Sequence, residues 1–106
     1  MSDFLTLKVE IIKNFGTPCA VVDLNVLEKN ISRVQKICDN AGLSNRPHIK
    51  THKSGEIARM QIDAGASGVT CQKLGEAEVM AAAGITDILI ATNLLGAAAS
   101  GALSAL

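Results

Sequence analysis

The sequence predicts an α/β fold built on a parallel sheet. Short apolar runs that are typical of buried strands alternate with stretches in which apolar residues recur at helical spacing. Residues 41–44, 64–67 and 83–86 repeat one pattern, Ala-Gly followed by an apolar residue and then Ser or Thr. The copies are offset by 23 and 19 residues, about the length of one strand plus one helix. This alternation indicates βαβ units with right-handed crossovers.

A lead-in helix is expected at the N-terminus, where Leu5, Val9 and Ile12 share one helical face. A glycine and a Thr-Pro pair follow directly and stop the helix. We therefore divide the chain into a lead-in helix at residues 1–16 and one α/β domain at residues 17–106.

The first strand and the clearest helix come next. Residues 19–24 form an apolar run after a proline, which predicts a strand buried on both faces. Asn25 and Glu28 have the spacing of a capping box, and Gly42 ends the helix that they begin. The apolar stripe of this helix consists of Leu27, Ile31, Val34, Cys38 and Ala41.

Further strands are expected at residues 48–52, 68–72 and 87–92. The helices between them begin near Ser54 and Leu74, and a poor fourth helix, with two glycines and no polar face, follows the last strand. Four strand–helix units are half of an eight-unit barrel, which takes about 250 residues. We therefore expect the N-terminal half of a parallel (β/α)8 TIM-type barrel, truncated after about four units.

Composition excludes several classes of function. The 106 residues are 48% hydrophobic and 19% charged with no net charge, which is typical of a single globular domain and argues against nucleic acid as a partner. Three scattered cysteines suit a reducing cytoplasm, and no run of residues has the length of a signal peptide core or a membrane span. Neither G-x-G-x-x-G nor a Walker motif occurs.

The candidate chemistry lies in the R-P-H-I-K-T-H-K string of residues 46–53. If the proline starts a strand, alternation places four side chains on one face: Arg46, His48, Lys50 and His52. A lysine held among cations and partly desolvated has a lowered pKa, because both effects disfavour its ammonium form. Such a lysine forms Schiff bases with carbonyls, including the aldehyde of pyridoxal phosphate. A basic strand end exposed to water is the alternative that composition leaves open.

Taken together, these segments resemble the fold-type III, alanine-racemase-like barrels, specifically the branch of D-threonine aldolase and D-serine dehydratase. The likeness runs from Thr17 to about Leu95 and rests mainly on the R-P-H-I-K-T-H-K string and on the K-L-G-E-A-E string of residues 73–78. Shorter matches near the first strand are Thr17-Pro18, Val22-Asp23, Leu27 and Asn30-Ile31. The resemblance implies that residues 17–106 are part of an alanine-racemase-like barrel domain.

In this family the lysine that ends the strand, here Lys50, forms the Schiff base with pyridoxal phosphate, so Lys50 is the expected catalytic residue. His48, Arg46 and Gln72 complete the expected cofactor-binding set, since two of them share the face of Lys50 and the third closes the next strand. A structural cation is the alternative for Arg46, and a core histidine for His48. No metal site is expected at His48 and His52, which have no companion ligand nearby.

Four other residues have simpler interpretations. Asn93 ends a strand but is as often a turn former there. Glu76 and Glu78 fall in the first turn of a helix, where carboxylates interact favourably with the helix dipole. Cys71 is expected to be a small buried hydrophobe.

The resemblance implies a pyridoxal-phosphate-dependent lyase that acts on small D-β-hydroxy amino acids. We favour the D-threonine aldolase type, which yields glycine and an aldehyde, over the alternative D-serine dehydratase type. Full-length members are expected to form homodimers and to bind a divalent metal through ligands late in the chain, which this sequence lacks. The other class of interpretation is a non-catalytic fragment or remnant. A piece of a longer enzyme, two assembled copies and a stranded remnant would each account for half a barrel.

Overall fold

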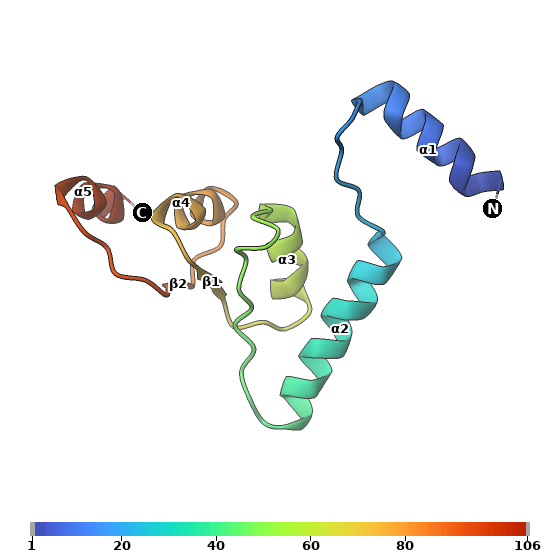
Figure 1. The fold of residues 1–106 in the computed structure, drawn as a ribbon. Helices are drawn as coiled ribbons and strands as arrows, with labels where there is room; N and C mark the ends of the chain where they lie inside the picture. The colour runs from blue at the N-terminus through green and yellow to red at the C-terminus, as the bar shows by residue number, and fades with distance from the viewer. Residues whose placement is uncertain (1, 106) are drawn as a thin grey trace.

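The computed structural model describes residues 2–105, which form an α/β arrangement of helices around a small parallel sheet (Figure 1). The first three elements are helices, and from α3 onward helices and strands alternate as the repeated pattern predicts. In order, they are α1 (Ser2–Phe15), α2 (Leu24–Asn40), α3 (Gly55–Asp63), β1 (Val69–Cys71), α4 (Leu74–Ala82), β2 (Ile88–Ile90) and α5 (Ala97–Ala105).

The sheet is parallel, as expected, but smaller than predicted. Within residues 2–105 it contains two strands, and β1 pairs with β2 so that Thr70 lies opposite Leu89. The segment before Lys50 lies beside β1 as a third, shorter extended segment, because His48 forms a parallel bridge with Thr70. In that bridge the Ile49 N–H donates to the Thr70 carbonyl at 2.9 Å. The half-barrel with four full strands is therefore not confirmed, although the α/β fold with a parallel sheet is.

The strand predicted at residues 19–24 is wrong. No strand is assigned there, and Val21 and Val22 remain 63% and 53% exposed. Helix α2 begins at Leu24 because the Asp23 carboxylate accepts the Val26 N–H at 3.1 Å. Asp23, rather than the expected Asn25, is thus the N-cap. An apolar run becomes a strand only when a neighbouring strand supplies hydrogen bonds, and the structure places none beside this segment.

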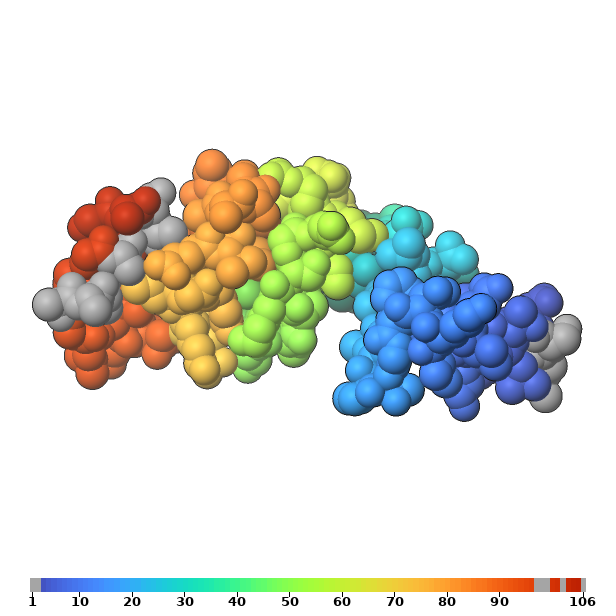
Figure 2. All heavy atoms as spheres, turned by 90° about the horizontal axis from the view of Figure 1, so that it is seen from above, coloured from blue at the N-terminus to red at the C-terminus, as the bar shows by residue number. Residues whose placement is uncertain are grey.

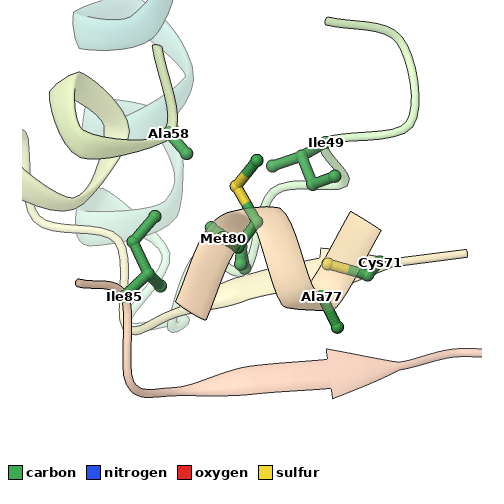
Figure 3. Packing of buried hydrophobic residues seen from close by; sticks show 7 residues of the cluster. Ile49, Ala58, Cys71, Ala77, Met80 and Ile85 are labelled. Atoms are coloured by element: carbon green, nitrogen blue, oxygen red, sulfur yellow. The ribbon is translucent and has the colours of Figure 1, made fainter. Parts of the chain in front are cut away.

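The core lies between one face of the sheet and the helices α3 and α4. Ile49, Val69, Cys71 and Met80 are fully buried there, and Figure 3 shows the cluster gathered around α4. The core is completed by Ala58, Ala77 and Ile85, with Ile62, Ile88 and Ile90 partly buried against it. Cys71 is therefore the small buried hydrophobe that its sequence position suggests.

The opposite face of the sheet is open. Alternation along each strand directs His48, Thr70 and Leu89 to the side away from the core. Leu89 is accordingly 50% exposed, whereas Val69 on the neighbouring strand is fully buried among the helices. Any functional group on these three positions therefore faces solvent in this chain.

The N-terminal helix stands apart from the core. The structure confirms a helix at Ser2–Phe15 in the predicted lead-in segment, and α1 with the segment after it forms one end of an elongated molecule (Figure 2). The radius of gyration is 17.0 Å, against about 13 Å expected for a compact domain of this length. Leu5, Val9 and Ile12 consequently remain exposed. Within residues 2–105, no helix combines the length and apolar character needed to cross a membrane.

Candidate functional site

Lys50 lies at the carboxyl end of the segment that pairs with β1. Ile49 beside it is fully buried, whereas Lys50 is exposed to solvent. Its backbone N–H donates to Nδ1 of His48 at 3.2 Å. Among the side chains that the structure describes, Lys50 Nζ has no hydrogen-bond or ion-pair partner. This amine is therefore available to a ligand at the sheet edge where parallel-sheet enzymes place reacting groups.

A tight turn that begins at Lys50 ends the strand earlier than expected. The Ile49 carbonyl accepts the N–H groups of His52 at 3.2 Å and of Lys53 at 2.8 Å. Lys53 adopts a positive φ of 52°, a conformation that few non-glycine residues take. The expectation that alternation continues to His52 is therefore wrong, since the chain leaves the sheet plane after Ile49. This turn sets the position of Lys50 relative to the next helix.

His52 is a structural residue of that turn. Its Nδ1 accepts the Ser54 N–H at 3.0 Å, and its Nε2 lies 3.2 Å from the Gln61 side-chain oxygen. Partial burial lowers the pKa of His52, and the Gln61 hydrogen bond opposes this effect in part. Ser54 itself caps α3 by accepting the Ile57 N–H at 3.3 Å, as the sequence predicts.

Glu76 connects the turn after Lys50 to the loop after β1. Its side chain is nearly buried, and its Oε1 forms an ion pair with Nζ of Lys53. Its Oε2 accepts the backbone N–H groups of Gln72 at 2.7 Å and Lys73 at 3.2 Å. The Lys53 hydrogen bond, followed by that of the Gln72 N–H, lowers the pKa of Glu76 to about 2, although burial opposes them. The interaction with the helix dipole is therefore only part of the role of Glu76, which also binds Lys53 and two backbone N–H groups.

Arg46 is held at the other end of its segment. Its two terminal nitrogens lie 2.7 and 3.0 Å from the carboxylate oxygens of Asp87. The hydrogen bond raises the pKa of Arg46 and lowers that of Asp87. The pair passes over Gly68, where a Cβ atom would lie 2.4 Å from the guanidinium. Lys50 is four residues further along, so the structure does not bring Arg46 and Lys50 together.

Gln72 and Asn93 follow β1 and β2, and both side chains are exposed. Gln72 lies at the same sheet edge as Lys50, one row beyond the bridge between His48 and Thr70. The buried thiol of Cys71 has a raised pKa because of burial, with a smaller effect from Glu76. No group of three His, Cys, Asp or Glu side chains suited to a metal ion occurs in the part of the chain that the structure describes.

Sequence reasoning missed both ion pairs of this region. Arg46 and Asp87 are 41 residues apart, and Lys53 and Glu76 are 23 apart. The one available signal was Glu76 at the third position of a helix, where a carboxylate reaches back to the preceding N–H groups. Its second oxygen is then free for a cation, but nothing local identifies Lys53 as that cation.

Comparison with known proteins gives one consistent family. The chain is 50% identical over 78 residues to D-threo-3-hydroxyaspartate dehydratase of Delftia sp. strain HT23, and 44% identical over 82 residues to D-threonine aldolase of Arthrobacter sp.. These matches cover 74% and 77% of this chain but 20% and 22% of the relatives. The chain thus spans about a fifth of the length of the curated relatives it matches.

Solved structures agree with these sequence matches. The crystal structure of D-threonine aldolase from Filomicrobium marinum superposes with a TM-score of 0.81 at 40% identity, over 84% of this chain and 24% of that one. D-threo-3-hydroxyaspartate dehydratase from Delftia sp. HT23 gives a TM-score of 0.78 at 45% identity, over 86% of this chain and 24% of that one. The family model for the N-terminal domain of alanine racemase matches residues 22–105. The chain therefore belongs to the alanine racemase N-terminal domain family, as its resemblance to D-threonine aldolase and D-serine dehydratase indicates.

Proposed function

We propose that this chain provides the cofactor-binding lysine of a pyridoxal-phosphate-dependent lyase of the D-threonine aldolase type. The observation that carries the proposal is the amine of Lys50, which has no partner among the described side chains, at the carboxyl end of the parallel strands. The names of the relatives supply the substrate class, because D-threonine and D-threo-3-hydroxyaspartate are both D-amino acids with a β-hydroxyl group. The activity is proposed for the enzyme in which such a segment forms the N-terminal part.

The residues present suit the aldehyde of pyridoxal phosphate. A primary amine is the group that condenses with an aldehyde, and Lys50 offers one that has no ionic partner in the part of the chain that the structure describes. His48 lies beside it, and Gln72 adds an exposed amide at the end of β1. Arg46 was expected to be either a cofactor-binding or a structural cation. We assign it the structural role, because Asp87 binds both of its terminal nitrogens.

Each of these residues has a defined task in the proposal. Pyridoxal phosphate, when bound, supplies an electron sink for the bond that breaks at the substrate α-carbon. Lys50 would hold the cofactor through its aldehyde carbon, and the burial of Ile49 fixes the backbone that carries Lys50. His48 accepts the Lys50 N–H on Nδ1, so in its neutral form it carries its ring hydrogen on Nε2. That N–H is a hydrogen-bond donor for a ligand on the open face.

Dehydration is the second candidate reaction. The 50% identity to a D-threo-3-hydroxyaspartate dehydratase favours it, because that relative is named for loss of water from the same class of substrate. Aldol cleavage breaks the bond between the α- and β-carbons, whereas dehydration removes the α-proton and the β-hydroxyl group. Lys50 has the same task in both reactions, so the site geometry serves either one.

We extend the proposal to architecture and surroundings. The open face around Leu89, which is 50% exposed, fits a chain that forms the N-terminal part of a closed (β/α) barrel. The complete enzyme is proposed to be a homodimer in the cytoplasm. The thiols of Cys19, Cys38 and Cys71 are all free, which suits a reducing compartment.

The proposal is tested by covalent trapping. The 106-residue chain is incubated with pyridoxal phosphate, reduced with borohydride, and digested so that peptide masses locate the modified lysine. The expected result is saturable modification at Lys50 that disappears in Lys50→Ala. A separate, unreduced sample is incubated with D-threonine and D-serine to separate glycine release from dehydration.

The distribution of label decides the outcome. Modification scattered over the exposed lysines of α1 and α2, and unchanged in Lys50→Ala, would refute a specific cofactor site on this chain. Lys36→Ala is the matched control, because Lys36 is an exposed lysine on α2, outside the sheet edge. This substitution should leave trapping at Lys50 unchanged.

A further inference from the structure

We propose that Glu76 confines aldehyde chemistry to Lys50 by holding the neighbouring lysine, Lys53, in an ion pair. This inference deepens the proposed function and takes from it the role of Lys50. Two primary amines lie on the same turn, three residues apart, at the edge of the sheet where the ligand is expected. A site that binds an aldehyde at one of them needs a means of excluding the other.

The structure distinguishes the two amines by their partners. Lys53 Nζ is paired with Oε1 of Glu76, whereas Lys50 Nζ has no partner among the described side chains. Lys53 is not protected by burial, since its side chain is 56% exposed. An aldehyde in solution can therefore reach both nitrogens, and the pairing is what separates them.

Glu76 is suited to hold a cation permanently. Its side chain is only 5% exposed, and its second oxygen is occupied by the N–H groups of Gln72 and Lys73. The carboxylate cannot follow a mobile lysine into water, so Lys53 must come to it. With a pKa of about 2, Glu76 keeps its negative charge at every pH at which a lysine amine is used.

The chemistry of the excluded step explains the effect. Condensation requires the nitrogen lone pair to attack the aldehyde carbon, after which the carbonyl oxygen leaves as water and a C=N bond replaces C=O. An ammonium held on a carboxylate has no free lone pair. Lys53 must first lose both a proton and its charge-assisted hydrogen bond, while Lys50 needs to lose only a proton. Glu76 therefore acts as a selectivity residue without touching the ligand.

Reductive methylation with formaldehyde and cyanoborohydride measures this selectivity lysine by lysine. Formaldehyde carries no phosphate, so the readout is independent of pyridoxal phosphate binding. In the unmodified chain Lys53 should react more slowly than Lys50 and than the exposed Lys36. In Glu76→Gln the Lys53 rate should rise by about tenfold, because the amide keeps an acceptor for the backbone N–H groups but loses the charge.

The control is Glu78→Gln, which removes an exposed carboxylate from the same helix and should leave the Lys53 rate unchanged. Lys53→Arg should leave Lys50 trapping by pyridoxal phosphate unchanged, since arginine keeps the ion pair and removes the amine. Equal Lys53 rates in the unmodified chain and in Glu76→Gln would overturn the inference. If Glu76→Gln does not fold by circular dichroism, the comparison of Lys53 with Lys36 in the unmodified chain decides it.

The two proposals fail separately. Absence of pyridoxal phosphate at Lys50 together with a faster Lys53 in Glu76→Gln would refute the proposed function and retain the protective ion pair. Specific trapping at Lys50 with a Lys53 rate equal to that of Lys36 would retain the function and refute the role of Glu76.

Discussion

Replacing Gly68, the residue before β1, by alanine should lower the stability of the folded chain. A Cβ atom at this position would lie 2.4 Å from the Asp87 backbone carbonyl and 2.4 Å from a terminal nitrogen of Arg46. Real Cβ atoms do not approach other atoms this closely, so something must move. The Arg46 side chain can rotate away, but the carbonyl belongs to the backbone that leads into β2 and accepts the Val69 N–H at 3.0 Å.

The magnitude follows from three terms. Overpacking against a backbone atom costs about 1–3 kcal/mol. Weakening the hydrogen bond between the Val69 N–H and the Asp87 carbonyl costs about 1 kcal/mol. Replacing glycine by alanine lowers the conformational entropy of the unfolded chain, which stabilises the folded state by about 0.5–1 kcal/mol. The net expectation for Gly68→Ala is a loss of about 2 kcal/mol in the free energy of unfolding, which is a large share for a small domain.

Urea unfolding followed by circular dichroism at the helical band measures this loss. The chain offers a matched control in Gly75→Ala, because Gly75 lies in the first turn of α4 with no heavy atom within 4 Å of its Cβ position. That substitution should be neutral or stabilise by up to about 1 kcal/mol. If Gly68→Ala unfolds at the same urea concentration as the unmodified chain, the close approach of the two backbone segments is refuted.

Two further predictions concern the core and the rim. Met80→Ala should lower the free energy of unfolding by about 2–5 kcal/mol, because Met80 is fully buried at the centre of the cluster, and the urea midpoint measures the loss. Glu76→Gln should unfold at a lower urea concentration than the unmodified chain. This difference should be full above pH 4.5, the ordinary pKa of the carboxyl, and should disappear as the pH falls towards 2, the pKa of Glu76 in the folded chain. Its folded-state pKa is depressed, so protonation favours the unfolded chain, and a difference in midpoint that persists at low pH would contradict the ion pair.

Helix positions were predictable from the sequence because their signals are local. Ser54 caps α3 as expected, and Gly42 and Gly65 take positive φ values after the helices that they end. Strands were harder, since a strand depends on hydrogen bonds from another segment. The apolar residues 19–24 have strand-like composition and yet form no strand and stay exposed, and Asp23 instead caps a helix that begins at Leu24.

In the candidate site, too, the features with local signals were predictable and those that depend on distant segments were not. Lys50 was identified from an eight-residue string. Its position at the end of a strand segment could be predicted from Pro47, which starts the segment, and from the apolar Ile49 before it. The partners of the flanking cations were not predictable, because Asp87 and Glu76 reach Arg46 and Lys53 from other strand–helix units. Alternation also failed after Ile49, where two hydrogen bonds to one carbonyl turn the chain away from the sheet.

The contacts that shape the lysine turn all come from consecutive strand–helix units. Ile49 packs against β1 and α4, Lys53 pairs with the first turn of α4, and His52 bonds to α3. In a parallel sheet each crossover helix returns the chain beside the previous strand, so neighbouring units build the rim between them. The opposite face is different, since Leu89 there remains 50% exposed. Consecutive units therefore set the position of Lys50 at the end of its segment, while the face of the sheet that carries Leu89 stays open.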